Sequence, residues 1–112
     1  MDFKLTPAVV RILQAFLTAP QTPRYGMQLM EAAKVSSGSL YPALTRLERA
    51  GWIVGADEDI DPRTEGRPAR RYYTMTGEGA RTARLELAEL SEQMRPPAPT
   101  PDWAAGTNPQ GA

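Results

Sequence analysis

The chain has 112 residues, which is enough for one folded domain and a short extension. It contains no cysteine and no histidine, which excludes disulfides, zinc-finger sites and acid–base catalysis by histidine. Its 13 basic and 13 acidic residues cancel, so the net charge indicates no partner class. The charges are nevertheless segregated, because residues 57–61 hold four acids and no base, whereas residues 63–71 hold four arginines and one glutamate.

The sequence also bears on targeting and catalysis. Its first residues lack the charged region and apolar run of a signal peptide, and no apolar stretch is long enough to span a bilayer. We therefore expect a cytoplasmic protein that does not associate with a membrane. Catalysis by carboxylates alone stays formally open, but there is no nucleophilic cysteine, glycine-rich phosphate loop or metal cluster. We expect a protein that is not an enzyme and holds no cofactor or metal.

Two helices are predicted near the N-terminus. Thr6 and Pro7 form a hydroxyl N-cap followed by a first-turn proline, and the helix they open has an apolar stripe of Val9, Ile12, Leu13, Phe16 and Leu17. Pro20 and Pro23 end this helix, since each disfavours helical geometry in the residue before it. A shorter helix over residues 25–33 should bury Tyr25, Leu29, Met30 and Ala33.

A third helix follows a tight turn at residues 34–38. Pro42 has no N–H, so the first full helical hydrogen bond should run from Ala43 to Ser39, which makes Ser39 the predicted N-cap. The core face of this helix comprises Leu40, Ala43, Leu44 and Leu47. The opposite face carries Gly38, Pro42, Thr45 and Arg49, flanked by Tyr41 and Arg46, and Gly51 ends the helix.

Two antiparallel strands are predicted at residues 52–56 and 70–75, with Tyr73 and Met75 pointing inward and Tyr72 and Thr74 outward. The loop between them is too long for a tight hairpin. Its Gly66–Arg67–Pro68 segment should form a stiff, extended turn that presents Arg67 at the tip. The acidic run in the loop lacks calcium-loop spacing, so we expect a solvated turn that pairs with arginines of the same loop.

The last predicted helix covers residues 76–94 and begins at an N-cap, Thr76. Its apolar residues step by 3, 4, 3 and 4, the a/d seam of a coiled coil: Ala80, Ala83, Leu87, Leu90 and Met94. Two heptads suffice for a dimer interface when the rest of the domain supports the helix. Residues 95–112 contain five prolines, two glycines and one isolated Trp103, which predicts a disordered tail.

This order of elements is that of a winged helix-turn-helix, so we predict a mainly α fold with a small β-hairpin. Residues 1–75 form the expected DNA-binding domain, residues 76–94 a C-terminal dimerisation helix and residues 95–112 the tail. The third helix suits the major groove, and the loop suits the minor groove of double-stranded DNA. The predicted DNA-binding residues are Ser36, Ser37, Ser39, Tyr41, Thr45, Arg46, Arg49, Arg67, Arg70 and Arg71.

Within this set, Thr45 and Arg49 are the expected base readers, while Tyr41 and Arg46 are expected to contact the DNA backbone. The serines offer hydroxyls and backbone amides to a phosphate. Arg67 would enter a narrow minor groove, and Arg70 and Arg71 would hold flanking phosphates. The alternative for each feature alone is an ordinary solvated helix face or loop.

The chain resembles the PadR family of bacterial transcription regulators, in its short form. The motifs that carry the resemblance are residues 25–26, residues 38–53 (GSLYPALTRLERAGWI), residues 66–73 (GRPARRYY) and residues 74–79 (TMTGEG). The resemblance implies a homodimeric winged helix, paired through its last helix, that binds a pseudo-palindromic operator, usually as a repressor. Some short members bind flat aromatic drugs in a dimer pore lined by a tryptophan on that helix, and this chain has no aromatic residue there.

Three questions stay open at the level of sequence. The chain could activate as well as repress, and the existence of a small-molecule effector is undecided. Trp52 either lines an effector cavity or anchors the core, and we favour the core. The rival function is a winged-helix module that binds a protein partner, through the same surface or through the tail with Trp103, without reading DNA sequence.

Overall fold

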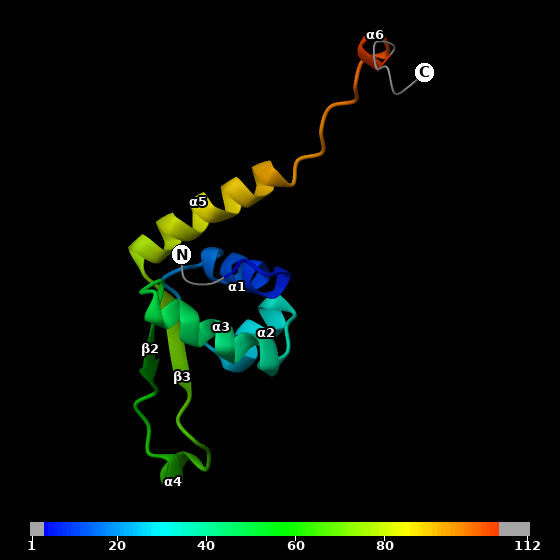
Figure 1. Cartoon of the computed structure of the whole chain (residues 1–112). Coiled ribbons are helices and arrows are strands. Elements are labelled where there is room, and N and C mark those ends of the chain that lie inside the picture. Colours follow the sequence, from blue (N-terminus) through cyan, green and yellow to red (C-terminus); the bar gives the residue numbers. More distant parts are fainter. Residues whose placement is uncertain (1–3, 106–112) are drawn as a thin grey trace.

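The computed structural model describes residues 4–105. Three helices, α1 (Pro7–Leu17), α2 (Gly26–Ala33) and α3 (Ser37–Arg49), pack together beside a small sheet. The sheet strands are β1 (Arg24–Tyr25), β2 (Ile53–Asp57) and β3 (Arg71–Met75), and α4 (Pro62–Glu65) lies between β2 and β3. A long helix, α5 (Gly77–Gln93), then leads away to α6 (Asp102–Ala105) (Figure 1). The predicted fold class, mainly helical with a small antiparallel sheet, is confirmed.

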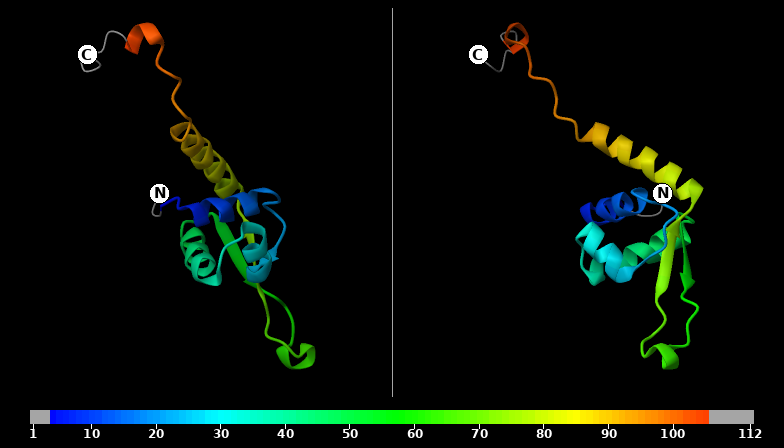
Figure 2. Two further views of the ribbon diagram at one scale, coloured as in Figure 1. Left: turned by 90° about the vertical axis from the view of Figure 1, so that its right-hand side faces the viewer. Right: turned by 180° about the vertical axis from the view of Figure 1, so that it is seen from behind.

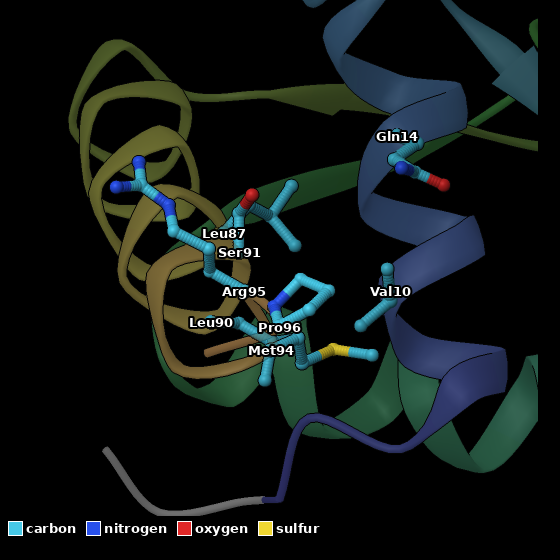
Figure 3. Close-up of a pocket in the computed structure, with 8 residues that line it drawn as sticks. All are labelled: Val10, Gln14, Leu87, Leu90, Ser91, Met94, Arg95 and Pro96. Carbon is cyan, nitrogen blue, oxygen red and sulfur yellow. The ribbon is translucent and has the colours of Figure 1, made fainter. Parts of the chain in front are cut away.

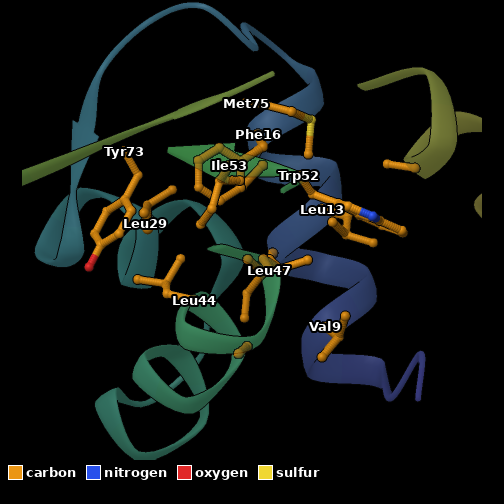
Figure 4. Packing of buried hydrophobic residues seen from close by; sticks show 14 of the residues in the cluster. Val9, Leu13, Phe16, Leu29, Leu44, Leu47, Trp52, Ile53, Tyr73 and Met75 are labelled. Atoms are coloured by element: carbon orange, nitrogen blue, oxygen red, sulfur yellow. The ribbon is translucent and has the colours of Figure 1, made fainter. Parts of the chain in front are cut away.

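The core lies between the three packed helices and the inner face of the sheet (Figure 4). It is apolar throughout, and none of its buried side chains in the described residues is polar or charged. Burying each large side chain contributes about 1.5–3 kcal/mol relative to leaving it in water. Its largest fully buried side chains are Phe16, Ile12, Leu13, Leu29, Leu40, Leu44, Leu47 and Ile53.

Local capping rules predicted two helix starts correctly. The hydroxyl of Thr6 accepts a hydrogen bond from the backbone N–H of Val9 at 3.2 Å, and Pro7 occupies the first turn of α1. At α5, the hydroxyl of Thr76 accepts from the N–H of Gly79 at 2.9 Å.

The start of α3 differs from the prediction. Its N-cap is Ser36, not Ser39, and the Ser36 hydroxyl accepts from the N–H of Ser39 at 3.3 Å. The N–H of Leu40 donates to the carbonyl of Ser36 at 2.9 Å, which begins the helical pattern before Pro42 is reached. Pro42 removes only its own hydrogen bond, so it does not prevent the earlier residues from forming a capped turn. Gly51, with φ +79°, follows the helix as expected.

The sheet has three strands in the order β1-β3-β2, where the sequence predicted two. Strand β3 pairs with β2 from Ile53↔Met75 to Asp57↔Arg71, and β1 adds a two-residue antiparallel pairing on the other edge. Tyr73 and Met75 are buried, as the alternation predicted. Trp52 precedes β2 and is only 7% exposed, which places it in the core.

The hairpin between β2 and β3 projects away from the helices as a wing, defined here as residues 57–71 (Figure 2). Its far end is α4, a helical turn that was not predicted from the sequence. Asp61 caps this turn by accepting from the N–H of Arg63 at 3.0 Å, and Gly66 closes it with φ +71°. The prediction that Gly66–Arg67–Pro68 forms the extended tip is therefore wrong, because α4 occupies that place.

The predicted seam of α5 divides into two parts. Ala80 and Ala83 are 6% and 0% exposed and belong to the core of the chain itself, so they are not available on the surface as predicted. Their small side chains let α5 pack closely against the body of the domain. Leu87 is half-buried against the core, Leu90 is half-buried and Met94 is 72% exposed, so the seam becomes more exposed toward its C-terminal end.

The predicted disordered tail begins after α5. Its described part includes α6, where Trp103 is 76% exposed, and residues 106–112 lie outside the described residues. None of the helices in residues 4–105 has both the length and the apolar character that a bilayer crossing requires.

Candidate nucleic-acid interface

The exposed face of α3 carries the residues that the sequence predicted there. Tyr41, Thr45, Arg46 and Arg49 are all exposed, on the side opposite the buried leucines of the same helix. The Thr45 hydroxyl donates to the carbonyl of Tyr41 at 3.1 Å and so remains able to accept a further hydrogen bond. This face is polar, basic and one helix wide, which are the properties that fit a major groove.

Two arginines lie on the exposed face of α3. Within residues 4–105, neither Arg46 nor Arg49 forms an ion pair, although the chain has equal numbers of acids and bases. Their guanidinium groups therefore keep all their hydrogen-bond donors for an external ligand.

The N-terminus of α3 combines hydroxyls with backbone donors. Ser36 and Ser39 are used partly within the protein, because the Ser36 hydroxyl caps the helix and lies 3.4 Å from the Ser39 hydroxyl. Ser37 is exposed in the first turn. The backbone N–H groups of Ser37 and Gly38 point out of the helix start without a hydrogen-bond partner in the described part of the chain, which suits a phosphate oxygen.

Arg71, predicted to hold a phosphate, is engaged within the protein. Its Nη2 donates to Oε2 of Glu48 on α3 at 2.8 Å, and its Nη1 donates to Oδ1 of Asp57 at 3.2 Å. These hydrogen bonds, with Glu48 first, raise the pKa of Arg71 above its ordinary value. Arg71 thus ties the base of the wing to α3 while 41% of its side chain stays exposed.

Arg67 is likewise engaged. Its two terminal nitrogens donate to the two carboxylate oxygens of Glu58, at 2.7 Å and 3.1 Å, which is bidentate pairing across the wing. The hydrogen bond from Arg67, assisted by the backbone N–H of Arg70, lowers the pKa of Glu58 to about 2. The predicted pairing of the acidic run with arginines of the same loop is confirmed for Asp57 and Glu58.

Arg70 is placed differently, since its guanidinium stacks on an aromatic ring. Its central carbon lies 4.4 Å from the ring centroid of Tyr25, and that ring meets Tyr72 edge-on with a centroid separation of 5.4 Å. Beside it is a groove of about 320 Å³, whose lining includes Gly26, Met27, Tyr41, Arg70 and Tyr73. Helix α2, helix α3 and the base of the wing thus meet around one arginine.

Two contributors to this surface were missed from the sequence. Tyr25 was predicted as a core residue, but it is half-buried and supports Arg70. Arg63 lies exposed on α4 at the far end of the wing. The pair Asp61–Pro62, a capping residue followed by a first-turn proline, was the sequence signal for α4. No comparable signal marks Tyr25, because its position depends on the pairing of β1 with β3.

The comparisons with known proteins agree with this architecture. A family model described as the transcriptional regulator PadR-like family matches residues 16–85. A PadR-like transcription factor from Bacteroides fragilis is similar with 22% identity and a TM-score of 0.59, covering 78% of this chain and 84% of that chain. A PadR family transcription regulator from Clostridium difficile R20291 has 21% identity and a TM-score of 0.57, covering 75% and 88% respectively.

A third solved structure concerns how 6-hydroxynicotinic acid regulates DNA binding by BpsR of Bordetella bronchiseptica. It has 20% identity and a TM-score of 0.61, covering 83% of this chain and 64% of that chain. At these identities the solved structures show a shared fold. No curated protein matches the chain. The family model, in contrast, spans more than half of the sequence and includes α2, α3 and the wing. The chain therefore belongs to the PadR-like family of transcriptional regulators.

Proposed function

We propose that this protein is a sequence-specific double-stranded DNA-binding regulator that acts as a dimeric repressor at a pseudo-palindromic operator. The observation that carries the proposal is the exposed face of α3, where Arg46 and Arg49 keep their guanidinium groups unpaired among the described residues. Arginine with two available donors is suited to bidentate contact with guanine or phosphate.

In this proposal, α3 lies in the major groove with Thr45 and Arg49 toward the base edges. Tyr41 and Arg46 contact the backbone on either side, and the start of α3, with Ser36, Ser37 and Ser39, faces a phosphate. The base of the wing, with Arg70 and Arg71, lies along the neighbouring phosphates. Contacts to base edges carry specificity, and contacts to phosphates carry most of the salt-dependent affinity.

Dimerisation is proposed through α5. The C-terminal part of its seam borders a groove of about 470 Å³ between α5 and α1, lined by apolar side chains of Val10, Leu87, Leu90 and Met94 together with Gln14 and the start of the tail (Figure 3). A second copy of α5 is the occupant that the heptad spacing favours. A two-fold dimer relates its two α3 helices by the same symmetry that a pseudo-palindromic DNA site has.

Selection of bound duplexes from a random DNA pool tests this proposal. A two-fold-symmetric consensus is the expected result, and the spacing of its half-sites would give the separation of the two α3 helices. A selection that enriches no sequence would contradict the proposal. It would favour a winged-helix module for protein binding, for which the exposed Trp103 of the tail is the supporting observation.

A further inference from the structure

Arg67 was predicted to reach into DNA, but its donors face the wing itself. Nη1 and Nη2 are bound to the carboxylate of Glu58, and Nη1 also donates to the carbonyl of Pro68 at 3.2 Å. Only a third of the Arg67 side chain and a fifth of the Glu58 side chain are exposed. A guanidinium held in this way cannot point into a minor groove without giving up its bidentate pair.

Glu58 connects Arg67 to the main chain of Arg70. Its carboxylate Oε1 accepts from the N–H of Arg70 at 3.2 Å, and its own N–H donates to the carbonyl of Arg70 at 2.7 Å. These contacts lie just beyond the last ladder pair of the hairpin, Asp57↔Arg71. The carboxylate therefore fixes the backbone of Arg70 where the regular sheet ends.

Arg70 is the cation whose position this arrangement controls. Its guanidinium lies over the Tyr25 ring and forms no side-chain hydrogen bond among the described residues, so its donors are left for another partner. Among the described residues it forms no ion pair, unlike Arg67 and Arg71. It also borders the groove that Tyr41 lines from α3. Arg70 and Tyr41 line the same groove, and a guanidinium together with a tyrosine hydroxyl supplies donors that suit a phosphodiester group.

We propose that Arg67 is a positioning residue, which holds Glu58 and through it sets Arg70 to bind a DNA phosphodiester in this groove. The inference rests on the proposed function and assigns different roles to the two arginines. Arg70 carries the contact, and Arg67 acts only through Glu58. This proposal and direct contact by Arg67 predict opposite effects of neutralising Glu58 on DNA affinity, because Glu58 brings a negative charge close to DNA. If Glu58 had no positioning role, neutralising it would strengthen binding.

The test is a double-mutant cycle on a duplex selected with the wild-type protein. Affinity is measured between 50 and 200 mM salt for R67A, E58Q, the double variant R67A/E58Q, R70A and the control R81A. We expect R67A and E58Q each to weaken binding by a factor of about 3 to 10, and the double variant to be no weaker than either. R67A should leave the slope of log affinity against log salt concentration (the salt slope) unchanged. R70A should reduce the magnitude of this slope by about 1 for each phosphate that is no longer bound. R81A removes an exposed arginine of α5, away from α3 and the wing, and should leave affinity unchanged.

Circular dichroism and urea unfolding check that each variant is folded under the conditions of the binding measurement. A tighter E58Q together with a reduced slope for R67A would overturn the proposal in favour of direct contact by Arg67. An R67A protein with wild-type affinity would overturn it as well. Failure of the wild-type protein to bind any duplex would instead refute the proposed function, so the two failures are distinguishable.

Discussion

The guanidinium of Arg71 on β3 donates to the carboxylate of Glu48 on α3 at 2.8 Å, so one ion pair joins the wing to the exposed helix. Both side chains are more than a third exposed, and solvent screening limits what such a pair adds to stability. Its consequence is geometric, because it restricts how the wing and α3 move relative to each other. In the proposed function, that restriction fixes the spacing of two elements that contact one DNA duplex.

The two unpaired arginines of α3 should have separable roles. Arg49→Ala is expected to cost about 1–3 kcal/mol of binding free energy and to relax the preference at one base position, since it removes a base contact. Arg46→Ala should weaken binding to all sequences alike and lower the salt slope by about 1, because one phosphate is no longer neutralised. Competition binding with single-base variants of the selected duplex measures both effects.

Arg81 on α5 is the matched control, because it is an exposed arginine away from α3 and the wing. Arg81→Ala should leave affinity and slope unchanged. Equal losses of affinity for all three variants would mean that general charge, rather than the face of α3, drives binding.

Gly79 should be far less tolerant than Gly77, although both lie in the first turn of α5. A Cβ on Gly79 would collide with the backbone of Trp52, whose Cα would lie at 2.6 Å, whereas a Cβ on Gly77 meets nothing within 4 Å. Gly79→Ala should lower the free energy of unfolding by about 1–3 kcal/mol, because backbone has to shift. Gly77→Ala should leave it unchanged or raise it by up to about 1 kcal/mol. Urea unfolding of the two variants makes the comparison, and equal stabilities would contradict this packing.

The pair formed by Glu58 and Arg67 predicts a pH dependence of stability. The pKa of Glu58 is lowered from 4.5 to about 2, so the folded protein favours the ionised carboxylate. Its contribution is therefore complete above pH 4.5 and is lost as the pH falls toward 2. The difference in urea midpoint between wild type and Glu58→Gln should shrink over this range. A difference that stays constant from about pH 6 to about pH 2.5 would show that Glu58 is not paired in solution.

Leu87→Glu combined with Leu90→Glu should convert a dimer into a monomer, because it places charge in the C-terminal part of the α5 seam. Sedimentation velocity measures the change. Leu85→Glu is the control, since Leu85 is 67% exposed and does not line the groove between α1 and α5. A double variant that still sediments as a dimer would place the interface elsewhere.

The parts of this structure that follow from short-range rules were predictable from sequence. Thr6 and Thr76 begin helices because a hydroxyl reaches an N–H three residues later, and the leucines of α3 are buried because they share one face. The prediction of Ser39 as the N-cap of α3 was wrong, because Pro42 removes only one hydrogen bond and Ser36 forms a favourable cap.

The parts that depend on tertiary contacts were not predictable. Arg67 and Glu58 are nine residues apart, and only the register of the hairpin brings them together. Burial of Ala80 and Ala83 within one protomer depends on how α5 packs against the domain, which a heptad pattern does not specify. The DNA-binding role of α3, the domain boundaries and the dimer seam remain predictions that rest on chemistry and family membership.

DNA recognition by α3 is tested most directly by the affinity of the wild-type protein for its selected duplex as a function of salt, alongside R46A/R49A. We expect a linear fall of log affinity with log salt, by about 10³–10⁵ between 50 and 200 mM if six to ten phosphates are contacted. We also expect R46A/R49A to bind much more weakly and with a shallower slope. Binding that is insensitive to salt, or unchanged in R46A/R49A, would contradict recognition of DNA by this helix.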